Sequence, residues 1–280
     1  MSSTHVYFGA EFCQTLLPSL AAVTEAARAA RASGAGFSLV TPPLNDVGVA
    51  AVGALLDALA QLNDETAGGR FEVVANDWAV LRLLARTPGR FVPVLGRLLA
   101  RMLRDPRLPP LETTGVAPAA ALAARQGQVT SPPFLKLIRS MGVERVELDN
   151  VQQGIAIDFE ALGLRPSLHL PFGFVTSGRI CPFAGIGQPK EAKFSVTTSC
   201  HHECRRYAAT MVDPNVGPSS SALLTVGNTV LQRQAAERVE RALSWATSQR
   251  ARLVVRRRPF DEQARGTEDP AQARAWMEEG

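Results

Sequence analysis

The feature that most constrains the fold of this chain is an alternation of short strand-like runs with Ala- and Leu-rich stretches of helical periodicity. The strand-like runs cover residues 6–12, 37–41, 71–77, 91–95, 145–149, 167–172 and 251–258. Most of them lead directly into a helical pattern, and such alternation is typical of βα units in a parallel sheet. Because about seven such strands follow one another, we predict a TIM-barrel-like parallel β/α barrel rather than an open doubly wound sheet.

Glycine-rich phosphate loops are absent from the strand-to-helix turns. The chain has neither GxGxxG nor GxxxxGK[ST] at these positions. Their absence gives no support to a dinucleotide-binding or P-loop fold.

The domain organisation follows from composition along the chain. With 280 residues, of which 46% are hydrophobic, the chain can bury a core without disulfides. We interpret residues 1–258 as one barrel domain. Within it we predict a Pro-rich insertion at about 105–133 and a cysteine-bearing segment at 177–207, and after it a polar C-terminal tail at 259–280.

Charge and hydropathy bear on location and partners. No apolar run approaches the roughly 18 residues needed to cross a bilayer, and MSSTHVYFGAEF lacks the pattern of a secretory leader. We therefore expect no transmembrane segment and a cytoplasmic location, where thiols stay reduced.

The net charge is +4 and 27 of the 30 basic residues are arginine. This balance permits nucleic acid or an anionic substrate but requires neither.

Four cysteines are the residues most suggestive of chemistry. Cys181, Cys200 and Cys204 lie within 24 residues, and Cys200 and Cys204 are spaced to share one face of a helical turn. Cys13 directly follows the first predicted strand. Since all strand C-termini of a parallel barrel open on one face, Cys13 can meet the other three there. Four thiolates at that mouth would suit a zinc ion or an iron–sulfur cluster.

The simpler interpretations stay open beside this one. A lone cysteine such as Cys13 is most often a small buried hydrophobic residue, and the Cys200–Cys204 pair can arise by chance. His201 and His202 lie between the paired cysteines, but adjacent side chains on a helix point in different directions, so at most one can join a shared site. Spacing alone does not separate zinc from iron–sulfur.

Several stretches resemble motifs of the U-32 peptidase-like (collagenase-like) family. VYFGAEFC is similar to the family's strand, Gly-Glu-type turn and first ligand cysteine, and TSGRIC is similar to its Ser-Gly-Arg-Cys hallmark. FSLVTPPLND, RFEVVANDWAVL, FVPVLGRLL and MGVERVELDN resemble its successive strand units. Cys200 and Cys204 match the closing cysteine pair of the family's UbiU/UbiV type. The resemblance covers most of residues 5–258, and its specific part is the cysteine pattern with TSGRIC.

The resemblance implies a cofactor, a partner and a reaction. Members of the family hold a 4Fe-4S cluster, whose ligands here would be Cys13, Cys181, Cys200 and Cys204. The UbiU/UbiV type acts in oxygen-independent ubiquinone biosynthesis. We therefore expect a heterodimer with a UbiU-like partner that takes part in hydroxylating a ubiquinone precursor, which is an aromatic or prenylated small molecule.

The chain also departs from the family pattern. The family has one strand-helix unit before the strand that bears the first ligand, so the resemblance implies a barrel short by one N-terminal β/α unit. Ile180 is inserted between the Arg and the Cys of the hallmark motif. The histidine often found just before that motif has no clear counterpart, because His169 lies earlier.

Other polar residues are candidates for a substrate site, while catalytic residues remain unassigned. Glu147, Asp149 and His169 lie at the ends of neighbouring predicted strands. They are candidates for general acid–base catalysis or for structural hydrogen bonding. Arg205, beside Arg206, is placed to hold an anionic substrate or to lie on the surface.

Two further patterns predict local structure. Asn76 and Asp77 close a strand, and we interpret them as a cap for the next helix. The spacing of Arg97, Arg101 and Arg104 predicts one basic, solvated helix face, with an RNA or partner contact as the alternative.

Two rival functions accompany the main hypothesis. One is a tRNA or rRNA hydroxylase of the same superfamily, which the low aromatic content of 6% does not favour. The other is a non-catalytic subunit in which zinc or a cluster stabilises the fold and which completes the active site of a partner. A peptidase is the least supported reading, because the chain has no GxSxG or HExxH motif and no cysteine beyond the four.

Overall fold

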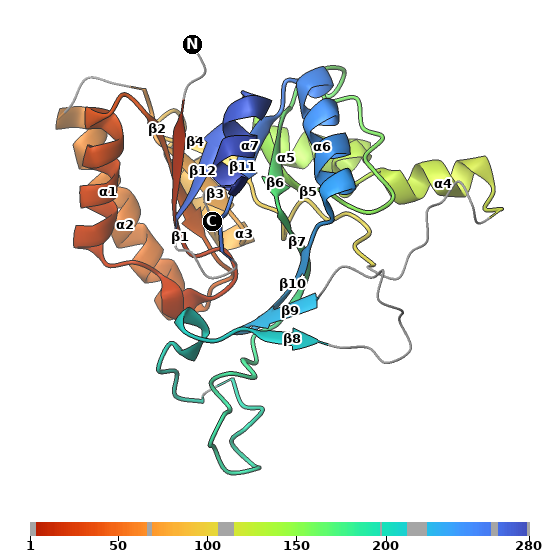
Figure 1. Cartoon of the computed structure of the whole chain (residues 1–280). Helices are drawn as coiled ribbons and strands as arrows, with labels where there is room; N and C mark the ends of the chain where they lie inside the picture. The colour runs from red at the N-terminus through yellow and green to blue at the C-terminus, as the bar shows by residue number, and fades with distance from the viewer. Residues whose placement is uncertain are drawn as a thin grey trace.

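The computed structural model of the chain describes residues 4–65, 69–105, 115–196, 198–211, 223–258 and 263–278. Eight strands form a closed barrel in the order β1-β12-β11-β6-β5-β4-β3-β2, seen in Figure 1. These strands are β1 (His5–Gly9), β2 (Gly36–Thr41), β3 (Glu72–Ala75), β4 (Val92–Leu95), β5 (Arg145–Asp149), β6 (Arg165–Leu170), β11 (Arg252–Val255) and β12 (Gln263–Thr267). The prediction of an α/β chain with a mostly parallel barrel is confirmed at this level.

The last strand closes the barrel against the parallel direction. All neighbouring pairs from β1 through β6 to β11 are parallel. β12 instead lies antiparallel to both β11 and β1, with Gly266 opposite Val254 and His5. Residues 263–278, predicted from the sequence to be a polar tail, therefore form the closing strand β12 and a helix at the C-terminal end, α7 (Pro270–Glu278). Their polarity misled the prediction because Gln263 and Arg265 alternate with the buried Ala264 and Gly266.

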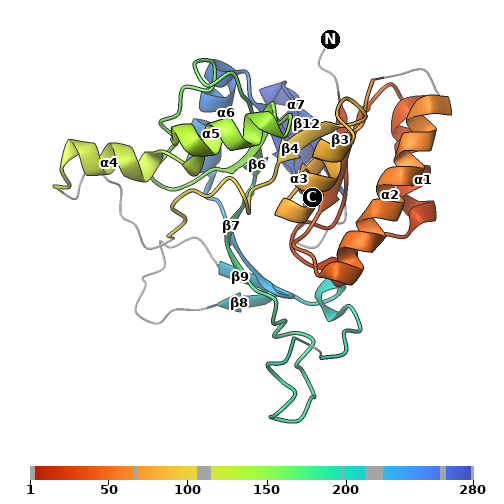
Figure 2. The ribbon, with the colours of Figure 1, turned by 180° about the vertical axis from the view of Figure 1, so that it is seen from behind.

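Helices cover the outside of the barrel (Figures 1 and 2). They are α1 (Leu20–Ala32), α2 (Asp46–Glu65), α3 (Trp78–Arg86), α5 (Pro132–Ser140), α6 (Ala236–Gln249) and α7 (Pro270–Glu278). Their buried faces pack on the outward side chains of the strands in one large apolar cluster. A smaller apolar cluster is drawn from the strands alone and lies inside the barrel; it consists of Tyr7, Val40, Val74, Val94, Val254 and Ala264.

In the described part of the chain, α2 alone has the length and composition of a helix that could cross a membrane. From the sequence, no transmembrane segment is expected. Its residues Val52, Leu55 and Leu59 are buried in the apolar cluster shared with the barrel. In this structure α2 is therefore a helix of the barrel's outer layer.

Two predicted segments differ from the structure. The run after β4, predicted as a helix with a basic face, makes only a single turn at Gly96–Ala100 and then continues as irregular chain. The Pro-rich insertion at 105–133 contains a helix, α4 (Pro118–Arg125), which extends away from the barrel in both views. Residues 106–114 of that insertion lie outside the described residues.

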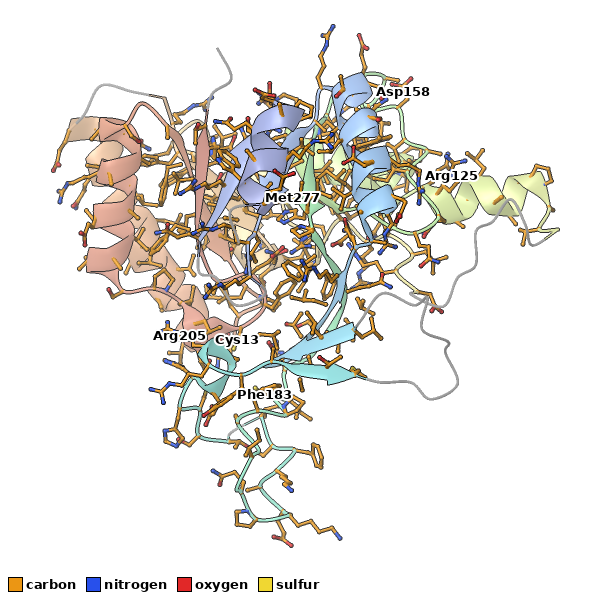
Figure 3. The ribbon with its side chains drawn as sticks, viewed as in Figure 1. Cys13, Arg125, Asp158, Phe183, Arg205 and Met277 are labelled. Atoms are coloured by element: carbon orange, nitrogen blue, oxygen red, sulfur yellow. The ribbon has the colours of Figure 1, made fainter. Side chains whose placement is uncertain are left out.

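A second sheet lies beside the barrel, at the C-terminal ends of the barrel's parallel strands. It has the order β7-β10-β9-β8 and comprises β7 (Phe172–Ser177), β8 (Ala209–Met211), β9 (Leu223–Val226) and β10 (Thr229–Arg233). Between β7 and β8 the cysteine-bearing segment loops away from the barrel (Figure 1). Figure 3 shows Cys13, Phe183 and Arg205 at the junction between this segment and the barrel. The fold thus sets the cysteine segment against the mouth of the barrel.

Candidate functional site

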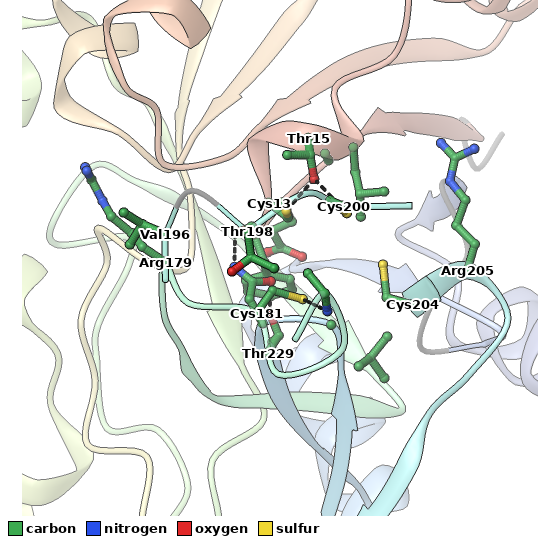
Figure 4. Close-up of a pocket in the computed structure, with 18 of the residues that line it drawn as sticks. Cys13, Thr15, Arg179, Cys181, Val196, Thr198, Cys200, Cys204, Arg205 and Thr229 are labelled. Carbon is green, nitrogen blue, oxygen red and sulfur yellow. Dashed lines mark hydrogen bonds between the residues drawn. The ribbon is translucent and has the colours of Figure 1, made fainter. Parts of the chain in front are cut away.

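All four cysteines line one pocket at the C-terminal mouth of the barrel. Cys13 follows β1 and directly precedes the short helix η1 (Gln14–Leu16). Cys181 follows β7, Cys200 lies in the loop after it, and Cys204 lies in the short helix η4 (Glu203–Arg205). The pocket has a volume of about 130 Å³ and appears in Figure 4. The structure therefore brings Cys13, 168 residues before Cys181 in the sequence, to the same cavity as the others.

Thr15 connects two of the thiols. Its Oγ1 lies 3.1 Å from Sγ of Cys13 and donates a hydrogen bond to Sγ of Cys200 at 3.8 Å. Figure 4 shows Thr15 between these two cysteines. A threonine two residues after Cys13 thus links the β1 end to the cysteine-bearing segment.

Backbone N–H groups point at two of the sulfur atoms. The N–H of Ala184 donates to Sγ of Cys181 at 3.5 Å, and the N–H of His202 donates to Sγ of Cys200 at 3.4 Å. Such bonds stabilise negative charge on sulfur and are among the features that tune a metal–thiolate site. His202 provides this contact through its backbone, in a left-handed conformation with φ of 60°.

Two of the four thiols, those of Cys204 and Cys181, have raised pKa values. Burial, followed by the effect of the other cysteines, raises the pKa of Cys204 to about 11. Burial likewise raises the pKa of Cys181. Thiolate ligands must lose their protons to bind a metal, so binding at this pocket would release protons.

The pocket contains suitable metal ligands, but their side chains are not arranged around a common point. In the described residues no group of three or more His, Cys, Asp or Glu side chains is arranged to hold a metal ion. The pocket nevertheless contains four thiols, and soft thiolate ligands select zinc or iron–sulfur clusters. His201 and His202 do not line this pocket. The chemistry of the side chains fits a four-thiolate group, and a bound group would have to draw the sulfur atoms together.

A buried network of ion pairs begins at the pocket with Glu11 and Arg256. Glu11 lines the pocket and makes a two-point ion pair with Arg97, whose Nη1 in turn contacts Asp149 at 2.7 Å. Nε of Arg104 lies 2.6 Å from the other oxygen of Asp149. Arg256 approaches Glu11 at 3.6 Å. The three arginines therefore keep the two buried acids, Glu11 and Asp149, in their charged form.

The pKa values of these acids reflect their partners. Burial alone would raise the pKa of Glu11, but Arg97 outweighs it and lowers the value to about 2. Burial also opposes ionisation of Asp149, and Arg97 with Arg104 lowers its pKa to about 2. Both acids are therefore carboxylates at neutral pH.

The predicted substrate-site residues divide among three places. Arg205 lines the cysteine pocket. Asp149 belongs to the ion-pair network, does not line the cysteine pocket, and also accepts a hydrogen bond from the N–H of Phe174 at 2.8 Å. Glu147 and His169 are hydrogen-bonded to each other inside the barrel and do not line the pocket. Tyr7 donates to Glu147 at 3.2 Å, so this pair belongs to the barrel interior.

Predictions for other polar residues have mixed outcomes. Asp77 caps α3 by accepting a hydrogen bond from the N–H of Ala79, as predicted, whereas Asn76 is buried and bonds to the carbonyl of Thr41. The prediction of a solvated arginine face is wrong for Arg97, which is only 2% exposed. Its carboxylate partners lie far away in the sequence, so helical spacing could not reveal its role.

Sequence reasoning also missed Glu11, Thr15 and Asn228. Glu11 and Thr15 flank Cys13 within two residues, and that proximity was the available signal. Asn228 lies between β9 and β10 and gave no signal, because its partners are backbone carbonyls of distant segments.

No protein-family model, curated protein or solved structure matches this chain. Function must therefore be argued from the residues of the pocket and from the motifs in the sequence.

Proposed function

We propose that this chain is an iron–sulfur protein in which Cys13, Cys181, Cys200 and Cys204 hold a 4Fe-4S cluster at the barrel mouth. The single observation that carries the proposal is that all four cysteines of the chain line one pocket. Chance burial would scatter four cysteines over a protein of this size. Zinc held by the same thiolates is the alternative cofactor.

The finer proposal is that the chain belongs to the U-32 peptidase-like family and is of the UbiV type. Its support is the TSGRIC motif, the cysteine order and the closed, mostly parallel barrel. The barrel is closed by β12, which lies between β11 and β1 and antiparallel to both.

On this proposal the protein works with a UbiU-like partner in the oxygen-independent hydroxylation of a ubiquinone precursor. A bound cluster would supply electron transfer. The chain itself would supply a pocket for the substrate, with apolar walls that include Phe12, Leu16 and Leu231. These walls would hold an aromatic body and exclude water from it.

The polar side chains of the pocket would orient such a substrate. Arg179 and Arg205 lie at its rim, and Arg256 approaches the buried Glu11. Because Glu11 is already paired with Arg97, it remains an ionised acceptor for a substrate hydroxyl. Arg179 and Arg205 favour a substrate that carries negative or strongly polar groups.

The test is elemental analysis of one anaerobic preparation reconstituted with iron and sulfide. We expect about four iron and four sulfide per chain, with broad visible absorbance. Each Cys→Ser variant should lose most of the bound iron, while Ser199→Ala, next to Cys200, should keep it. Absence of bound iron and sulfide would refute the cluster, and one stoichiometric zinc would assign the alternative.

The rival functions give different results. A tRNA or rRNA hydroxylase would retain RNA at low salt and release it steeply as salt rises. A metal-stapled, non-catalytic subunit would bind its partner and metal, yet leave the partner's activity equal with and without it. The hydroxylase pair that we propose requires both chains for product formation.

A further inference from the structure

The turn between β9 and β10 lies against the cysteine pocket. Val226 pairs with Thr229, so Gly227 and Asn228 form a two-residue hairpin tip. Gly227 has φ of 60°, which favours glycine and suits such a turn. Both tip residues line the pocket.

The side chain of Asn228 joins two cysteine-bearing segments. Its Nδ2 donates to the carbonyl of Phe12 at 2.9 Å and to the carbonyl of Gly178 at 2.6 Å. Phe12 immediately precedes Cys13, and Gly178 lies three residues before Cys181. Thr229 donates from Oγ1 to Oδ1 of Asn228 at 3.1 Å, which fixes the orientation of the amide. One side chain thus ties the end of β1 to the end of β7.

Gly227 lies close to Cys204 and Cys181. A Cβ atom at this position would lie 3.0 Å from Cβ of Cys204 and 3.4 Å from its Sγ. The same atom would lie 3.9 Å from Sγ of Cys181. Both sulfur atoms therefore lie against the bare backbone of the hairpin tip, and any larger residue would push them outward.

From these contacts we propose that the hairpin tip Gly227-Asn228 is the positioning element of the four-cysteine site. Asn228 sets the separation of Cys13 from Cys181, and Gly227 sets the approach of Cys204 to Cys181. This inference rests on the proposed function only in so far as the four cysteines act as one site. Neither tip residue is a ligand, so both act through the geometry of the thiols.

The first test replaces the amide. Asn228→Ala removes the hydrogen bonds to the carbonyls of Phe12 and Gly178. The matched control is Asn150→Ala. Asn150 is also a partly buried asparagine, and it donates to Gln234 and to the carbonyl of Arg238. With zinc as the probe and a chelator in competition, we expect Asn228→Ala to weaken binding by about 10- to 100-fold, as for other residues that orient ligands. The control should bind zinc like the wild type, and equal losses in both variants would overturn the proposal.

The second test fills the space at the hairpin tip. Gly227→Ala introduces the clash with Cys204, and Gly187→Ala is the control, since Gly187 also has positive φ, of 76°, but no atom within 4 Å of an added Cβ. An alanine at either position has a positive φ, so both variants carry backbone strain. Zinc binding that weakens in Gly227→Ala alone supports the proposal, and equal weakening in the two contradicts it.

A metal-free measurement separates this inference from the proposed function. In a Cys200→Ser/Cys204→Ser background only Cys13 and Cys181 remain, and dibromobimane fluoresces when it bridges two nearby thiols. Adding Asn228→Ala should slow bridging roughly tenfold, because two hydrogen bonds that hold the segments are lost, while Asn150→Ala leaves the rate unchanged.

The two proposals then fail separately. Unchanged bridging and zinc binding in Asn228→Ala would refute the positioning role while leaving the metal site intact. Slowed bridging in a protein whose wild type binds neither zinc nor iron would uphold the positioning role and refute the proposed cofactor.

Discussion

Arg97 and Glu11, 86 residues apart in the chain, form a two-point ion pair, with Nε to Oε1 at 2.7 Å and Nη2 to Oε2 at 2.6 Å, and Glu11 lines the cysteine pocket. Each side chain is at most 3% exposed. The pair joins the end of β1 to the irregular chain after β4, and Asp149 extends it to β5. The residues around the pocket are therefore fixed to one another through the barrel mouth before any ligand binds.

Removing one partner of this pair should strongly destabilise the protein. Arg97→Met leaves the carboxylates of Glu11 and Asp149 buried without their main cation, and we expect a loss of about 3–5 kcal/mol in the free energy of unfolding. The control is Arg90→Ala, which breaks the exposed Arg90–Asp64 pair and should cost about 0–1 kcal/mol. Urea unfolding measures both, and similar losses would contradict the assigned burial.

The same network predicts sensitivity to acid. The pKa of Glu11 falls from 4.5 to about 2 on folding, and that of Asp149 falls from 3.8 to about 2. Since both values are lowered, the stability they contribute is present above the unfolded pKa and is lost as pH falls toward 2. Urea unfolding between pH 5 and about 2 should show this decline. Glu11→Gln should flatten the curve, and an unaltered slope would count against the network.

Tyr7 provides a spectroscopic test of the barrel interior. Burial raises its pKa well above the ordinary value of 10, and its hydroxyl lies between Glu147 and Arg252. The chain has two tyrosines, so Tyr207→Phe leaves Tyr7 as the only one. Its ionisation, read by ultraviolet absorbance, should be absent near pH 10 in the folded protein and appear on denaturation. Stability should fall as pH rises above 10, because only the unfolded state ionises.

Truncating the same hydroxyl should destabilise the fold. Tyr7→Phe removes a donor to Glu147 and an acceptor for Arg252, at a cost of about 1–3 kcal/mol. Tyr207→Phe, at a position 59% exposed, should change stability by less than about 0.5 kcal/mol. Equal effects would contradict the buried position of Tyr7.

Gly266 tests the closure of the barrel by β12. An added Cβ would lie 2.8 Å from the ring of Tyr7 and 2.9 Å from Cδ of Arg252, so Gly266→Ala should cost about 1–3 kcal/mol through overpacking. Gly53→Ala in α2 meets no atom within 4 Å and should instead stabilise the helix by up to about 1 kcal/mol. Thermal unfolding that moves both variants in the same direction would refute this placement of β12.

The local pattern predicted the parts of the fold that repeat. Runs such as 37–41 and 145–149 became β2 and β5 because short runs with apolar and β-branched residues, each followed by a helical pattern, fit parallel strands that are buried on both faces. The cap at Asp77 followed from one side chain and the backbone next to it. Cys181, Cys200 and Cys204 were grouped by proximity in the sequence, and Cys13 by the rule that parallel strands end on one face.

What the sequence by itself determined was thus the succession of strands and helices and the identity of the thiols. Only the tertiary structure decided that Arg97 turns inward, that residues 263–267 close the barrel and that Asn228 bridges the segments of Cys13 and Cys181. These features depend on distant partners: Arg97 pairs with Glu11, 86 residues away, Asn228 bonds to Phe12, 216 residues away, and β12 lies beside β1 at the other end of the chain. Periodicity records which face of an element is buried, but a long-range ion pair or hydrogen bond exists only once the chain has closed around it.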